Sequence, residues 1–379
     1  MFKVQNYLYL SAFFVILIFL ILFPQKITFL TSAALTKCSK VIIPSVFPFA
    51  VITQVLTRTG ISTKAGMCMS HIISPVIGIP KELCGAFITG IFGGFPGGAH
   101  ATGIVYSQGL CTDKEAERCV ALSNGCSIPF LISVCGIYTL GSIKNGLFLM
   151  ISQFITVIIT AQILKFIQRI PYRKSSIHII ASQNLTSGLS SVICQSITEA
   201  CSITLNVCGF ITVFYILSGL LSNTFNMPME LRALISGAME ITSGSDTVKF
   251  LNFPENFIIY SVISGFTGIS VILQVTDAAS KYGISANEFI FSRFINAVVT
   301  PVVTAILLLI CPLKAITVFN YTSEINSNER ISLWNTITVY ALLFALVMIS
   351  LYTVYAASII IQKHTENKIL KNKKNKSIY

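Results

Sequence analysis

Residues 87–98 read FITGIFGGFPGG, an apolar segment that four glycines and one proline interrupt between positions 93 and 98. A regular helix does not tolerate this composition, because glycine lowers helix stability and an internal proline removes a backbone hydrogen bond. Inside a bilayer, unwound backbone persists only where protein buries it or where it lines a watery cavity. In a membrane protein this stretch is therefore a tight loop between contacting helices or part of a binding site.

The composition of the chain places it in a membrane. Of its 379 residues, 54% are hydrophobic and only 11% are charged, whereas soluble domains carry about 25% charged residues. So few charges would not cover a soluble fold of this length, and apolar surface must face lipid. The apolar runs are continuous rather than alternating, which favours helices over a β-barrel. We therefore expect an all-α polytopic membrane protein, and not an enzyme, since P-loop, HExxH and GxSxG motifs are absent.

Eight apolar runs are long enough to cross a bilayer core about 30 Å thick. They are Tyr7–Phe23, Val41–Leu56, Gly125–Leu140, Gly146–Leu164, Val192–Leu221, Phe257–Leu273, Phe289–Cys311 and Ser332–Ile361. The first run has the look of a signal peptide, but the residues that follow offer no small-residue cleavage site, so we interpret it as an uncleaved helix. About eight transmembrane helices result.

Basic residues set the orientation of these helices. One cluster runs from Lys165 to Lys174, and six lysines lie between Lys363 and Lys376. The positive-inside bias places both clusters, and both termini, in the cytoplasm. Much of the net charge of +12 is then explained by contact with anionic lipid. We expect the bilayer, and no nucleic acid, as partner; the sequence does not fix the oligomeric state.

A second interrupted segment occupies the corresponding place in the second half of the chain. Residues 234–245 read LISGAMEITSGS and align with residues 87–98 without gaps, matching one isoleucine and two glycines. Both surrounding segments, Glu82–Gly98 and Met229–Lys249, are short and broken by small residues, so we expect two re-entrant hairpins. Each half then holds a span, a hairpin and two further spans. Because three spans is an odd number, the second copy is inverted, as in many secondary transporters.

The candidate substrate site lies on these interruptions. Free backbone N–H groups of the glycine loop are suited to an anion, and a carboxylate at membrane depth, Glu240, is costly and normally functional. Neighbouring hydroxyls and an amide complete the set. The candidate residues are Gly93, Gly94, Phe95, Pro96, Gly97, Gly98, Ser123, Asn124, Glu240, Thr242 and Ser243.

Structural roles compete with these functional ones. Close helix packing would explain the glycines, and a hydrogen bond across the repeat interface would explain Glu240. A helix cap by Ser123 or Asn124 is an equal alternative for that pair. We expect the charged stretch Asp113–Arg118 to be a solvated helix face, and Gln274 to mark an ordinary helix end. The eleven cysteines are scattered, so no metal or cofactor is expected.

Together these residues carry a family resemblance over roughly residues 5 to 310. The quoted motifs are Pro44-Ser-Val-Phe-Pro-Phe49, the loop at 93–98, Glu115-Ala-Glu-Arg118 leading to Ser123-Asn124, and Gly237-Ala-Met-Glu-Ile-Thr242. In this order they resemble the sporulation integral membrane proteins of the YlbJ type, also called SpoVV. These belong with the nucleoside-recognition or Gate-domain membrane proteins, which are distantly similar to concentrative nucleoside transporters. The family commonly has Gly-Tyr-Pro-x-Gly and Ser-Asn-Asn, where this chain has Phe95 and Gly125.

The resemblance implies a domain organisation and a function. The expected parts are a first transmembrane helix (1–30), a first Gate-like repeat (31–170), a cytoplasmic linker (171–191), a second, inverted Gate-like repeat (192–312), an outer loop with the last transmembrane helix (313–362) and a basic cytoplasmic tail (363–379). The implied activity is movement of dipicolinic acid, a small organic anion, across the outer forespore membrane from the mother cell toward the forespore. Two alternatives stay open: a nucleoside or other small-metabolite transporter of the same fold, and a non-transporting sporulation scaffold.

Overall fold

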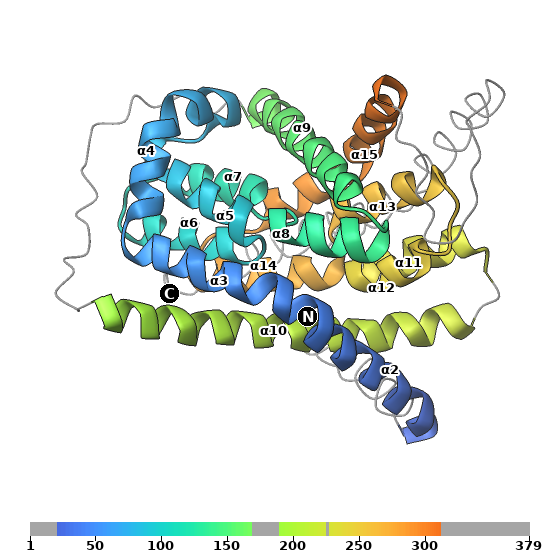
Figure 1. Cartoon of the computed structure of the whole chain (residues 1–379). Helices are drawn as coiled ribbons and strands as arrows, with labels where there is room; N and C mark the ends of the chain where they lie inside the picture. The colour runs from blue at the N-terminus through green and yellow to red at the C-terminus, as the bar shows by residue number, and fades with distance from the viewer. Residues whose placement is uncertain (1–20, 169–188, 225–226, 312–379) are drawn as a thin grey trace, which may run out of the picture. The chain divides into compact units, whose positions relative to one another are not determined.

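Helices make up all the regular secondary structure in residues 21–168, 189–224 and 227–311, which are the residues that the computed structural model describes (Figure 1). All of them belong to one unit, Met1–Ser323. The elements are α2 Pro24–Lys37, η1 Cys38–Ile42, α3 Ile43–Arg58, α4 Ile61–Ile73, η2 Ser74–Gly78, η3 Lys81–Leu83, α5 Cys84–Gly93, α6 Gly97–Ser107, α7 Asp113–Ser123, α8 Ile128–Phe130, η4 Leu131–Thr139, α9 Ile143–Gln168, α10 Leu189–Thr224, α11 Met229–Met239, α12 Ile241–Val248, α13 Glu255–Phe266, α14 Ile269–Ser280 and α15 Asn287–Ile310.

Six stretches of the described chain are long and apolar enough to cross a membrane. They are Pro24–Arg58, Asp113–Thr139, Ile143–Ile167, Leu189–Leu221, Glu255–Ser280 and Asn287–Ile310. Each contains or overlaps one of the predicted runs, and the pattern is that of a polytopic membrane protein. Two predicted runs remain. Ser332–Ile361 lies outside the described residues, and so does Tyr7–Phe23 except for its last three residues.

The first half contains one further apolar helix pair, of which we expected only the second member, as part of the hairpin Glu82–Gly98. Helix α4 with η2 (Ile61–Gly78) meets η3 with α5 (Lys81–Gly93) at a bend of 108°, so that the pair is a broken span or a re-entrant loop. The described residues therefore hold six spans, or seven if this pair counts as one. Lys64 and His71 interrupt the apolar character of α4 and hid it in the sequence.

The two halves of the described chain share an order of elements. Each begins with a long helix, α3 or α10, and later has a short helix pair that meets at a break, α5–α6 or α11–α12; in the first half α4, η2 and η3 lie between these parts and have no counterpart in the second half. A helix interrupted in its middle follows: α7 passes into α8 and η4 through residues 124–127, and α13 passes into α14 through Thr267 and Gly268. A final long helix, α9 or α15, closes each half. The interrupted segments predicted from sequence are thus the two short helix pairs.

Glycines allow the backbones of several neighbouring helices to approach one another closely. A Cβ atom on Gly66 of α4 would lie 2.2 Å from the backbone nitrogen of Gly85 on α5. A Cβ on Gly136 of η4 would lie 2.6 Å from the Cα of Gly146 on α9. Small residues allow such close approach of backbones, which drives helix association where lipid removes the hydrophobic driving force. Helix α10 in turn packs along α2 and α3 (Figure 1).

Three of the five charged side chains at the start of α7 are buried, so our expectation of a solvated face over Asp113–Arg118 is wrong. Asp113 and Lys114 are exposed, but Glu115, Glu117 and Arg118 are buried. Glu115 forms a capping box with Thr112. The Arg118 guanidinium donates to the carbonyl oxygens of Gly78 (3.2 Å) and Leu164 (3.1 Å). Gly78 is the last residue of η2, and Leu164 lies near the C-terminal end of α9. Carbonyl groups at helix ends lack donors within the helix, so the arginine supplies donors to two helix ends at once.

A second arginine, Arg293, is fully buried inside α15. Its Nη2 atom donates to the Ala121 carbonyl oxygen of α7 (3.0 Å), and Nε and Nη2 also contact the Ser292 hydroxyl (3.3 Å each). When the Asn296 amide is oriented to satisfy both its ends, its oxygen accepts from Arg293 Nη2 at 2.9 Å. Neutral oxygens, rather than a carboxylate, therefore solvate this charge and fix α15 against α7.

We predict that Gly66→Ala destabilises the protein by about 1–3 kcal/mol, because overpacking forces backbones apart. Thermal unfolding of detergent-purified protein would measure the loss. The matched control is Gly209→Ala in α10, where a Cβ would meet no atom within 4 Å; it should leave stability unchanged or raise it by about 0.5–1 kcal/mol. Equal stability of Gly66→Ala and the control would contradict the close contact of α4 with α5.

Candidate functional site

The two broken helix pairs meet at one pocket. Its wall contains Gly93, Gly94 and Phe95 from the α5–α6 loop, together with Glu240 and Thr242 from the α11–α12 break. We call this space the hairpin pocket. Its remaining lining residues come from η1, α3, the α7–α8 connection, α8, α10, α12 and α14: Ile42, Val46, Ser127, Phe130, Val207, Ile211, Ile241, Val271 and Gln274. Five of the eleven predicted site residues are therefore brought together from segments far apart in the sequence.

The glycine loop is shaped by packing as well as by the pocket. Gly94 has a φ of 69°, and a Cβ there would lie 2.8 Å from the Ser127 Cβ, so only glycine fits. A Cβ on Gly98 would lie 2.6 Å from the Ser123 hydroxyl oxygen. Gly97 differs, because no atom lies within 4 Å of its Cβ position. Close packing explains Gly94 and Gly98, while Gly97 has open space beside it.

Several N–H groups of this loop are already used within the fold. Gly94 N–H donates to the Gly90 carbonyl oxygen (2.7 Å), and Gly98 N–H donates to the Gly94 carbonyl oxygen (3.3 Å). The Ala99 N–H donates to Asn124 Oδ1 (3.0 Å). We predicted that free N–H groups of the glycine loop are suited to an anion. These three N–H groups are already hydrogen-bonded within the fold and are not free to hold one.

Glu240 creates the break between α11 and α12. Its backbone is extended (φ −154°, ψ 128°), so α11 ends at Met239 and α12 begins at Ile241. The side chain, only 1% exposed, then accepts hydrogen bonds at Oε2 from the Ser243 N–H (2.8 Å) and the Thr242 hydroxyl (2.5 Å). It thus caps α12 at its N-terminus. The carboxyl group also lines the hairpin pocket, so that one side chain caps a helix and faces the candidate ligand space.

Gln274 of α14 is the polar residue that our sequence reasoning undervalued. It lines the hairpin pocket and is 5% exposed. Its Nε2 atom donates to the Ser270 hydroxyl (3.2 Å), while Oε1 is buried without a hydrogen-bond partner. A buried amide oxygen without a partner costs free energy, and here it marks a position for a ligand donor. An amide inside an otherwise uncharged apolar run was the available signal.

Ser123 and Asn124 lie outside the hairpin pocket. Asn124 is fully buried and accepts from the Ala99 N–H, while its Nδ2 atom donates to the Val120 carbonyl oxygen (2.8 Å) and the Ser123 hydroxyl (3.2 Å). It therefore supports the first turn of α6 from the end of α7. The alternative that Ser123 or Asn124 caps the following helix is wrong, because Ser127 caps α8 by accepting from the Phe130 N–H.

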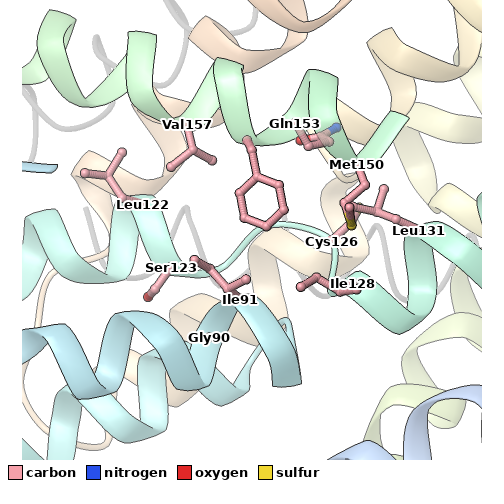
Figure 2. Close-up of a pocket in the computed structure, with 12 residues that line it drawn as sticks. Gly90, Ile91, Leu122, Ser123, Cys126, Ile128, Leu131, Met150, Gln153 and Val157 are labelled. Atoms are coloured by element: carbon pink, nitrogen blue, oxygen red, sulfur yellow. The ribbon is translucent and has the colours of Figure 1, made fainter. Parts of the chain in front are cut away.

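Ser123 instead lines a second pocket, beside α9 (Figure 2). Most of the side chains labelled there are apolar, including those of Ile91, Leu122 and Val157. Gln153 adds a polar group whose Nε2 atom donates to the Ser264 hydroxyl (2.9 Å). Each pocket has little free volume, about 30 Å³ beside α9 and about 20 Å³ in the hairpin pocket, which is space for about one water.

A charged pair lies directly behind the Glu240 turn. Lys37 of α2 donates from Nζ to the Thr242 carbonyl oxygen and to Asp246 Oδ2, both at 2.6 Å. Sequence reasoning missed Lys37, because it began the span at Val41 rather than at Pro24. A lysine inside a 35-residue apolar helix was the signal that would have found it.

The chain is similar to a known membrane protein along most of its length. It is 24% identical over 341 residues to the sporulation integral membrane protein YlbJ of Bacillus subtilis (strain 168), with 80% of this chain and 83% of YlbJ covered. This similarity supports a YlbJ-like family assignment. With the candidate spans, this assignment identifies an integral, multi-pass membrane protein. No protein-family model and no solved structure matches it.

We predict that Asn124→Ala lowers the free energy of unfolding by about 1–3 kcal/mol, since it removes the three hydrogen bonds of a fully buried side chain and leaves the Ala99 N–H with only the Pro96 carbonyl oxygen (3.1 Å) as acceptor. Thermal unfolding of the purified protein would measure this loss. Ser123→Ala serves as control, because Asn124 keeps two of its three hydrogen bonds there, and it should cost less. A fully stable Asn124→Ala protein that no longer binds ligand would instead place Asn124 in the substrate site.

Proposed function

We propose that this YlbJ-like protein transports a small organic anion, with dipicolinic acid as the favoured substrate, across the outer forespore membrane during sporulation. The observation that carries the proposal is the convergence of two broken helix pairs on the hairpin pocket. Paired interrupted helices around a central site are typical of secondary transporters. The sporulation setting comes from the similarity to YlbJ, a sporulation integral membrane protein, and the substrate from the family resemblance.

The matching order of elements supports an inverted repeat as the basis of transport. The first half contributes the glycine loop to the pocket, and the second half contributes Glu240 and Gln274. In such transporters, movement of one repeat against the other exposes the site alternately to the two sides. The small free volume of the pocket fits a closed state, which opens when the α5–α6 pair separates from the α11–α12 pair.

Glu240 gives the transporter a way to link an anion to a proton. Two carboxylates in one buried site do not both stay ionised, since like charges at short distance disfavour each other. A carboxylate ligand beside Glu240 therefore takes up a proton that the two groups share. Gln274 assists, because its amide can turn to present an N–H group to the ligand while Ser270 donates to its oxygen.

A nucleoside or a related neutral metabolite is the second candidate substrate. Glu240 and the unpaired Gln274 Oε1 are both hydrogen-bond acceptors as the structure stands, and acceptors suit the hydroxyl and amino groups of such ligands. This ligand would bind without taking up a proton. Proton linkage therefore separates the two substrate classes.

Ligand-induced stabilisation of purified protein would test the substrate class. We expect dipicolinate, and not nucleosides, to raise the unfolding temperature, with an affinity that falls by up to about tenfold per pH unit as pH rises and Glu240 ionises in the free protein. Glu240→Gln, which cannot ionise, should bind dipicolinate with little pH dependence. Uptake into proteoliposomes would show whether transport follows the same pattern.

The matched control for this series is Glu199→Gln, which removes an exposed carboxylate that pairs with Arg58 away from the pocket. It should keep the pH dependence of the unchanged protein. Stabilisation by nucleosides but not by dipicolinate would reverse the order of the two substrates. An unaltered pH profile of binding and transport in Glu240→Gln would remove Glu240 from the mechanism.

A deletion strain of the source bacterium would test the physiological role. We expect its spores to contain much less dipicolinate than those of the parent strain, and expression of the intact chain to restore the content. A Glu240→Gln copy should restore it less well at neutral pH or not at all, because proton linkage is lost. Normal dipicolinate in the deletion strain would refute the sporulation role.

A further inference from the structure

The charged pair behind the hairpin pocket has the form of an occupied cation site. The Lys37 ammonium lies 2.6 Å from one carboxylate oxygen, Asp246 Oδ2, and 2.6 Å from one backbone carbonyl oxygen, that of Thr242. Only 5% of the Lys37 side chain is exposed, against 31% for Asp246. Oxygens of this kind, next to an interrupted helix, coordinate the coupling cation in transporters with broken helices.

Four elements contribute to this arrangement. The Tyr138 hydroxyl of η4 donates to Asp246 Oδ1 (3.1 Å), and the Tyr215 hydroxyl of α10 donates to Asp246 Oδ2 (2.8 Å). The Lys37 ammonium also lies 4.9 Å from the ring centre of Tyr215 and 5.7 Å from that of Tyr138, within the range of cation–π attraction. A carboxylate, a carbonyl and two aromatic faces thus surround one positive charge supplied by α2.

Thr242 links this charge to the proposed substrate site. Its carbonyl oxygen accepts from Lys37, and its hydroxyl donates to Glu240 Oε2 (2.5 Å). The first turn of α12, which positions Glu240, is therefore fixed from behind by the ammonium group.

We propose that the Lys37 ammonium is a tethered cation that fills a monovalent-cation site behind α12, so that the protein needs no dissolved sodium or potassium. The part that concerns transport rests on the proposed function, whereas the site itself does not. Removal of the lysine side chain leaves the Asp246 carboxylate, the Thr242 carbonyl and two tyrosine rings beside the place of the ammonium group. A small dissolved cation then takes the vacant position, because the half-buried Asp246 carboxylate has lost the positive group that contacts it.

The test compares unfolding temperatures of detergent-purified protein in NaCl, LiCl, KCl and choline chloride at equal ionic strength. The unchanged protein should unfold at one temperature in all four salts. Lys37→Ala should unfold at a lower temperature in choline chloride and recover part of the loss in NaCl or LiCl. Lys37→Ala combined with Asp246→Asn should lose this recovery, since the carboxylate that attracts the cation is gone.

Lys249→Ala is the matched control. Lys249 lies three residues beyond Asp246, and its ammonium contacts the Tyr138 ring (2.9 Å to the centre), yet no hydrogen bond joins it to Thr242 among the described residues. Its loss should create no dependence on the salt. Sodium-specific stabilisation of the unchanged protein would overturn the proposal, even if Lys37→Ala fails to fold. A folded Lys37→Ala protein with equal unfolding temperatures in all four salts would also overturn it.

Transport is measured separately, in proteoliposomes with radiolabelled dipicolinate in sodium or choline buffer. Equal uptake by the unchanged protein in both buffers is expected. Uptake that needs sodium would refute the tethered cation and leave the proposed function intact. Absence of uptake in either buffer would refute the proposed function, while the salt dependence of unfolding would still decide the cation site.

Discussion

The requirement that backbone polar groups find partners inside the bilayer governs this structure. A helix satisfies it along its length, but each interruption exposes N–H groups and carbonyls that need side-chain partners. The break between α5 and α6 is resolved by Asn124, whose side chain accepts from Ala99. The break between α11 and α12 is resolved by Glu240, whose side chain accepts from Ser243. Each short helix pair thus has one buried polar side chain at the start of its second helix. For α6 this side chain is Asn124, which comes from the end of α7, and for α12 it is Glu240, which directly precedes that helix.

This difference explains why one of the two residues faces the candidate ligand and the other does not. Asn124 uses both ends of its amide within the fold and is fully buried. Glu240 uses one oxygen for its cap and lines the pocket. The two departures from the family pattern lie at different pockets, Phe95 at the hairpin pocket and Gly125 at the second pocket beside α9. Phe95 lines the pocket and contacts Phe130 edge to face at 6.4 Å, so the wall that a tyrosine would make polar is apolar here. A Cβ atom added at Gly125 would lie 3.9 Å from Arg293 Nη1.

Sequence reasoning found the features that local chemistry determines. Long apolar runs located the six spans in the described part of the chain, and the glycine loop and Glu240 located both helix breaks. It failed where a residue's role depends on distant partners. Arg118 reads as a surface charge, since its acceptors at Gly78 and Leu164 are remote in sequence. Gln274 reads as a helix end, because only the fold brings it beside Glu240. Lys37 was missed since its partners lie on α12, about two hundred positions later.

The buried Arg293 bears on how the chain is built into the membrane. Arg293 lies in the second turn of α15, which runs from Asn287 to Ile310, and an arginine within a spanning helix opposes transfer from the translocon into lipid, by at most about 2.5–3.5 kcal/mol at the helix centre. Insertion of α15 is therefore favoured by a partner that is already in the membrane. Its acceptor, the Ala121 carbonyl oxygen, lies on α7, which leaves the ribosome much earlier. The chain order therefore provides a docked partner before α15 emerges. Insertion of this helix becomes a late, templated step of biogenesis, and truncations that remove α7 would strand α15 at the membrane surface.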